Sequence, residues 1–64
     1  MHDPILVSPR EAARLLGVSR SQVYRLLTSG ELTAHKLGRR TLIDVESIRT
    51  YGASLPAWAP ESDG

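Results

Sequence analysis

The sequence predicts a mainly α-helical fold with one small β-hairpin, in the order helix, turn, helix, hairpin, helix. Two consecutive segments, Ser8–Gly17 and Ser19–Gly30, each begin with a serine cap signal and end on glycine, which predicts a pair of short helices. After Gly30 the composition becomes strand-like on both sides of Gly38, which predicts a hairpin over roughly residues 33–43.

The first helix is expected within the segment Ser8–Gly17. Ser8 and Glu11 stand three residues apart, as in a capping box, and Pro9 occupies the first helical position, where its missing N–H costs nothing. Apolar residues at helical spacing predict the buried face of this helix, which comprises Ala12, Leu15 and Leu16.

The second helix is expected over residues 19–29 and begins with a similar box, formed by Ser19 and Gln22. Its predicted buried face comprises Val23, Leu26 and Leu27. The two apolar faces should pack together, with Val18 filling the turn. Two short helices joined in this way describe a helix-turn-helix, whose second helix typically enters the DNA major groove.

The hairpin and a third helix complete the predicted fold. An isolated hairpin is not stable in water, so it must pack on the helices, and Leu37 and Ile43 are the expected contacts. Asp44 is expected to cap a helix from Val45 to about Ser54. Its predicted apolar stripe comprises Val45, Ile48, Tyr51 and Leu55. This order of elements is a winged helix-turn-helix in which the hairpin is the wing.

One domain accounts for most of the chain. Residues 1–7 are expected to be an N-terminal lead-in that is extended near its end. Residues 8–55 form the predicted winged helix-turn-helix domain. Residues 56–64 are expected to form a flexible tail, in which Trp58 is the one side chain able to fold back.

Size and composition exclude several classes of protein. A chain of 64 residues has room for one small core and almost none for a deep catalytic cleft, so we expect no enzyme and no catalytic residues. The chain has no cysteine, and we expect neither a metal nor another cofactor. No apolar run could span a membrane and no signal peptide is recognisable, so a cytoplasmic, nucleoid-associated location is expected.

The small net charge conceals a strong asymmetry. Residues 10–40 contain seven cations and two carboxylates, a net charge of +5, whereas the rest of the chain carries one arginine and five carboxylates, a net charge of −4. Together with the helix pair, this favours a polyanionic partner over a merely solvated basic surface. Arg10 and Arg14 lie on one face of the first helix, where they contact a nucleic-acid backbone or pair with Glu11 and solvent.

Three motifs occur together in this chain: Glu-Ala-Ala with Leu-Gly-Val-Ser-Arg at the turn, Val-Tyr-Arg-Leu with Ser-Gly-Glu-Leu in and after the second helix, and Gly-Arg-Arg at the wing tip. In these motifs the stretch from Ser8 to about Leu55, about three quarters of the chain, resembles the small excisionase-type winged-helix domains related to the MerR regulators. None of the three motifs is specific when it stands alone.

The resemblance implies a stand-alone module that binds double-stranded DNA sequence-specifically. Its role would be that of an excisionase (a recombination directionality factor) or of a small transcriptional regulator of a phage or mobile element. In this family's fold, the helix over 19–29 lies in the major groove and the wing over 33–43 covers the backbone or minor groove. An integrase or other recombinase is the implied protein partner. Because one helix and one wing read few base pairs, we expect a monomer in solution that assembles side by side on repeated sites.

A helical wheel centred on the buried Val23 identifies the expected DNA contacts of the second helix. Arg20 lies nearer the core edge, but in the first turn, where it can reach along the groove. The outward and flanking positions are Ser21, Gln22, Tyr24, Arg25 and Thr28.

Several of these residues have two interpretations. Arg25 either reads guanine O6 and N7 with its fork or clamps a phosphate. Gln22 either pairs with adenine or holds the N–H of Ser19. Ser21 suits close approach to DNA or a phosphate bond. Tyr24 either lies on a sugar or a thymine methyl with its hydroxyl on a phosphate, or packs at the core edge against the wing.

The wing carries a second set of cations. Arg39 and Arg40 at its tip are expected to contact the backbone, with one entering the minor groove, whereas the alternative is a solvated turn. Lys36 is a phosphate candidate. His35 is not expected to bind a metal, because the chain offers no set of ligands around it.

A second hypothesis from another class is a protein-interaction adaptor. It would dock on an integrase or another partner through the basic face or through Trp58, since an exposed tryptophan is a typical hot-spot residue. Salt separates the two hypotheses, because DNA binding through phosphate contacts weakens steeply as salt rises.

Overall fold

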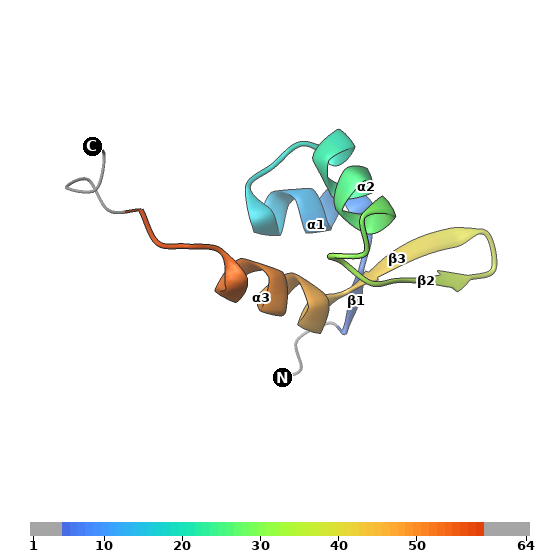
Figure 1. The fold of residues 1–64 in the computed structure, drawn as a ribbon. Helices are drawn as coiled ribbons and strands as arrows, with labels where there is room; N and C mark the ends of the chain where they lie inside the picture. Colours follow the sequence, from blue (N-terminus) through green and yellow to red (C-terminus); the bar gives the residue numbers. More distant parts are fainter. Residues whose placement is uncertain (1–4, 59–64) are drawn as a thin grey trace.

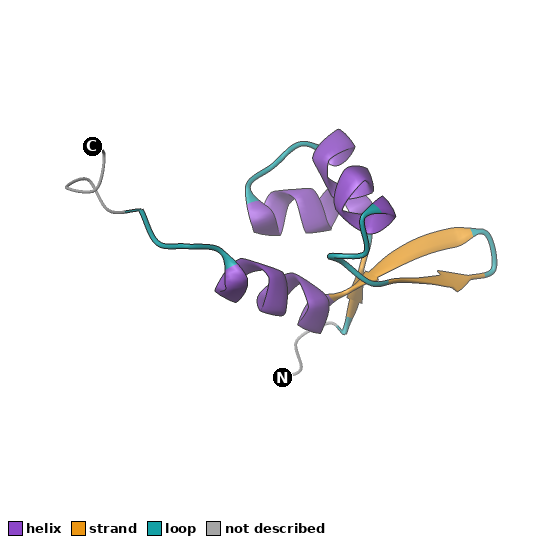
Figure 2. Cartoon of the chain, viewed as in Figure 1, coloured by secondary structure: helices purple, strands orange, loops and turns teal. Residues whose placement is uncertain are grey.

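The computed structural model describes residues 5–58 of the chain (Figure 1). Helices predominate, and three short strands form one antiparallel sheet, so the predicted fold class, a winged helix-turn-helix, is confirmed (Figure 2). In chain order the elements are β1 (Leu6–Val7), α1 (Pro9–Leu16), α2 (Arg20–Thr28), β2 (Ala34–Leu37), β3 (Arg40–Asp44) and α3 (Val45–Ser54).

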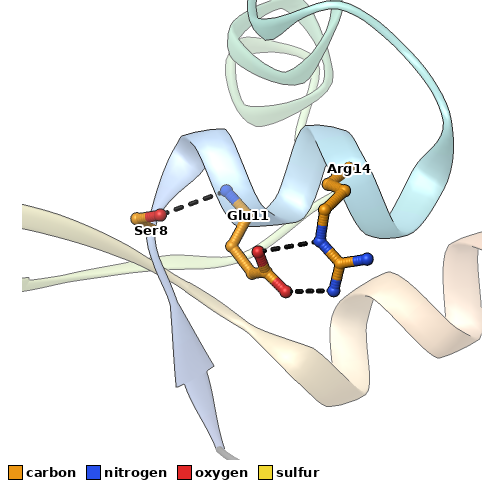
Figure 3. A network of polar contacts seen from close by, with 3 residues as sticks. All are labelled: Ser8, Glu11 and Arg14. Atoms are coloured by element: carbon orange, nitrogen blue, oxygen red, sulfur yellow. Dashed lines mark hydrogen bonds and ion pairs between the residues drawn. The ribbon is translucent and has the colours of Figure 1, made fainter.

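The helix starts follow from the local sequence. Ser8 Oγ accepts a hydrogen bond from the N–H of Glu11, and Ser19 Oγ accepts one from the N–H of Gln22, each at 3.1 Å. The Glu11 carboxylate does not close the capping box but accepts from Arg14 instead (Figure 3). Gly17 ends α1 in the left-handed conformation, with φ of 73°, and its N–H donates to the carbonyl of Ala13 at 2.8 Å.

The sheet has the strand order β1-β3-β2, and all its pairs are antiparallel. The lead-in strand β1 was expected only to be extended, but it pairs with β3, with Val7 opposite Ile43. Leu37 pairs with Arg40, so Gly38 and Arg39 form a two-residue turn. Gly38 has φ of 62° whereas Arg39 has a negative φ, which fits a type II′ turn. In Figure 1 the β2–β3 hairpin projects away from the helices.

The core lies where the two helices, the sheet and α3 meet. Ala12, Val23 and Ile43 are fully buried, so the predicted contact between the faces of α1 and α2 is confirmed. The other members of this core are Val7, Ala13, Leu26, Leu32 and Ile48, with Leu16, Leu27, Val45 and Tyr51 packed against it.

Two predictions about the helix pair are wrong. Leu15 is 47% exposed, because it lies about 110° around α1 from the midpoint between Ala12 and Ala13, which face α2. Val18 does not fill the turn: its side chain is 37% exposed, and its N–H donates to the carbonyl of Ala13 at 3.0 Å.

Two further predictions about the core are wrong. Leu37 is 64% exposed. Leu37 pairs with Arg40 next to the turn of the hairpin, and the hairpin projects away from the helices (Figure 1), so Leu37 lies beyond the core. Leu55 does not extend the apolar stripe of α3, because the helix ends at Ser54 and Leu55 has extended backbone angles.

The third helix begins and ends as predicted. Asp44 Oδ1 accepts from the N–H of Glu46 at 2.9 Å, which confirms Asp44 as the cap. After α3, Trp58 is 81% exposed, so it does not fold back onto the core. The remainder of the expected tail, residues 59–64, and the first four residues of the lead-in lie outside the described residues. Within residues 5–58, every helix is too short or too polar to cross a bilayer.

Candidate nucleic-acid interface

Helix α2 turns one polar face to solvent. Val23 and Leu26 fix its opposite face in the core, at 0% and 4% exposure. The exposed side chains at the predicted contact positions are Arg20, Ser21, Tyr24, Arg25 and Thr28, and Gln22 is half-buried. The outward direction inferred from the helical wheel therefore agrees with the burial of each residue.

An open, shallow hollow lies on this outward face. Four of its lining residues are predicted contacts, Ser21, Tyr24, Arg25 and Thr28. The fifth is Ser29, which sequence reasoning missed as a site residue. Its spacing was the available signal, because Ser29 follows Arg25 by four residues and so lies one turn further along the same face.

Gln22 takes part in the cap of α2 through its backbone and not through its side chain. Its backbone N–H is bound by Ser19 Oγ at 3.1 Å. Within residues 5–58 its side-chain amide makes no hydrogen bond to the N–H of Ser19. The amide is therefore not held by the helix cap.

The cations of the wing lie near its tip, on both faces of the hairpin and in its turn. Lys36 pairs with Thr41, two residues before Ile43, so Lys36 shares the sheet face that packs on the helices. Arg40 lies on the other face, opposite Leu37, and Arg39 is in the turn itself. All three cations are exposed.

The cations at the predicted contact positions have no carboxylate partner within residues 5–58. In the described part of the chain, no ion pair or side-chain hydrogen bond involves the five site cations, namely Arg20, Arg25, Lys36, Arg39 and Arg40. Arg14 behaves differently, because its Nε donates to Glu11 Oε1 at 3.0 Å (Figure 3). This hydrogen bond lowers the pKa of the Glu11 carboxyl and raises the pKa of the Arg14 guanidinium.

Several contacts connect the base of the wing to the N-terminal end of α3. His35 Nε2 lies 3.7 Å from Asp44 Oδ2, and both side chains are partly exposed. The N–H of Asp44 donates to the carbonyl of Thr33 at 2.9 Å, and the N–H of Thr33 donates to Ser47 Oγ at 3.1 Å. These contacts fix the base of the wing relative to α3. Among the described residues, no three His, Cys, Asp or Glu side chains gather as a metal site would require.

Comparison with known proteins agrees with this architecture. Residues 6–54 match a family model described as a helix-turn-helix domain. The chain belongs to this helix-turn-helix family. Its members bind DNA and are typically not enzymes. A protein of Saccharopolyspora erythraea named "Probable excisionase" is 38% identical to this chain over 53 residues. The expected membership in the excisionase-type group is thereby confirmed.

Other relatives of the helix-turn-helix domain carry no functional name. Uncharacterized proteins of Mycobacterium tuberculosis and Mycobacterium bovis are each 42% identical over 45 residues, which is 70% of this chain and 40% of each relative. The match to the Saccharopolyspora protein covers 83% of this chain and 54% of that relative. The chain therefore spans about half or less of the length of these relatives.

Proposed function

We propose that the chain binds double-stranded DNA sequence-specifically, with α2 in the major groove and the β2–β3 wing on the backbone or in the minor groove. The observation that supports this most is the set of exposed, unpaired cations on α2 and the wing, since phosphates would supply the missing counter-charges. A groove-facing helix with cations on either side is what this docking mode requires.

The residues divide into base-reading and backbone-binding groups in this proposal. Arg25 reads guanine, because its unpaired guanidinium lies at the middle of the outward face and can donate to O6 and N7 together. Gln22 is available for adenine, since its amide is not used in the cap. The backbone-binding group comprises Arg20, Lys36, Arg39 and Arg40, whereas the small Ser21 allows close approach to the DNA.

The role we propose is that of an excisionase or recombination directionality factor of a phage or mobile element, which bends DNA beside an integrase. The name of the Saccharopolyspora relative supports this role. One helix and one wing read few base pairs, so we propose a monomer that assembles side by side on repeated sites. A small transcriptional regulator would use the same contacts and is the nearest alternative.

A second candidate function is protein docking. Trp58 favours it, because an 81% exposed tryptophan next to the folded domain is a typical interface anchor. Truncation after Pro56 separates the two candidates: DNA binding would survive the truncation, whereas docking through Trp58 would be lost.

Selection of bound fragments from the source genome, followed by a gel-based bending assay on the enriched site, tests the proposed role. Repeated sites next to an integrase gene, together with a strong bend, would support the excisionase. A promoter site without a bend would favour the regulator. An absence of enrichment at low salt would contradict DNA binding and leave the docking function.

A further inference from the structure

The hollow on α2 has an apolar part formed by Tyr24 and Thr28. Tyr24 is 44% exposed, so its ring offers a flat carbon surface. Thr28 Oγ1 donates its hydrogen to the carbonyl of Tyr24 at 3.0 Å, which uses the hydroxyl proton within the helix. Thr28 can then offer a ligand its γ-methyl group and a hydroxyl oxygen that only accepts. The hydroxyl of Ser29, at the end of the hollow, lies 3.1 Å from the carbonyl of Leu26 and 3.0 Å from the Glu31 carboxylate, so it too is satisfied internally.

The other part of the hollow offers unsatisfied donors. Ser21 and Arg25 line it, and neither makes a side-chain hydrogen bond within residues 5–58. Ser21 lies one turn before Arg25, on the same helix face. The hollow therefore places a carbon surface directly beside hydrogen-bond donors.

A base edge that fits this hollow must present an apolar group for the carbon surface and, beside it, an acceptor for the donors. Thymine presents its C5-methyl group beside the acceptor O4, whereas cytosine presents a donor there, and the purines present no methyl group. We propose that this hollow is a thymine-reading site, in which the C5-methyl group packs against Tyr24 and Thr28 and O4 accepts from the Ser21 hydroxyl. The inference rests on the proposed function, because it assumes that α2 lies in the major groove.

Substitution of deoxyuridine for thymidine tests this site directly, since it removes only the C5-methyl group and keeps base pairing. The full chain would first be used to select its duplex from a random library. Each thymine of that duplex would then be replaced in turn and the affinity measured. We expect one position per bound copy at which uracil lowers affinity by about four-fold, the effect of removing one buried methyl group.

Matched variants locate the methyl contact on the protein. Tyr24→Ala should bring the thymine-to-uracil affinity ratio at that position close to one, whereas Tyr24→Phe, which removes only the hydroxyl, should leave the ratio unchanged. Thr28→Ser, which removes the methyl group, should lower the ratio, and Thr28→Val, which keeps it, should not. Circular dichroism of each variant checks that the fold is retained.

Three results would overturn the inference: a selected site with no thymine at any fixed position, specific binding without any uracil-sensitive position, or a uracil effect that persists in Tyr24→Ala. In each of these the protein still selects a sequence, so the proposed function stands. Failure of the proposed function is distinguishable, because no duplex would then be enriched.

Discussion

Asp44 Oδ2 lies 3.7 Å from His35 Nε2, while Oδ1 of the same carboxylate caps α3 through the N–H of Glu46. One side chain thus joins the wing to the third helix. Asp44 also ends β3, so the sheet passes directly into α3 without a loop.

Asp44→Ala should lower the free energy of unfolding by about 1 kcal/mol, because it removes the cap of α3. Asp44→Asn is the matched control, since asparagine also caps helices but carries no charge for His35. Urea denaturation measures both variants. Equal stability of Asp44→Ala and the unmodified chain would show that this cap does not stabilise the domain.

Truncation should destabilise the domain at Ile43 but hardly at Leu37. Ile43→Val should cost about 0.5–1.5 kcal/mol, because Ile43 is fully buried in the core. Leu37→Ala, although it removes more atoms, should change stability by no more than about 0.5 kcal/mol, because Leu37 is 64% exposed. Thermal denaturation of the two variants checks the burial of the two side chains, and a reversed order of stability would contradict it.

Stability should depend on pH through Glu11. Its pKa is lowered in the folded chain by the hydrogen bond from Arg14, so the pair stabilises the fold above the ordinary glutamate pKa of 4.5. This contribution is lost as the pH falls through the lower pKa of the folded state. Glu11→Gln should therefore melt below the unmodified chain at pH 7 and together with it at strongly acidic pH. A difference in melting temperature that is independent of pH would contradict the assignment.

Arg25 and the wing tip should affect DNA binding in different ways. Arg25→Ala should abolish the preference for the selected sequence, because it removes the base-reading fork. Arg39→Ala combined with Arg40→Ala should weaken binding to all duplexes alike and reduce the salt slope by about 1.8, for two lost phosphate contacts. Competition binding measures both effects. Intact specificity in Arg25→Ala would show that this residue does not read a base.

The sequence predicted what local signals determine. The caps at Ser8, Ser19 and Asp44 were recognisable because each serine or aspartate binds an N–H only two or three residues away. The outward face of α2 followed from helical periodicity. Burial was less predictable for Leu15 and Leu37, because it depends on how the helices meet and on how far the wing projects from the core.

Two other features had no local signal. Leu32 is 3% exposed and belongs to the core, but it stands alone in the segment after α2, where no periodicity marks it. Strand β1 has only two residues, and its pairing with β3 joins segments more than thirty residues apart. Such long-range contacts are visible only in the folded chain.

The dependence of affinity on salt tests the central claim, DNA binding through unpaired cations, most directly. With Arg20, Lys36, Arg39 and Arg40 on phosphates, the logarithm of the binding constant for the selected duplex should fall with the logarithm of the salt concentration with a slope of about −3.6. A slope near zero, or equal affinity for selected and scrambled duplexes at every salt concentration, would contradict sequence-specific binding through these residues.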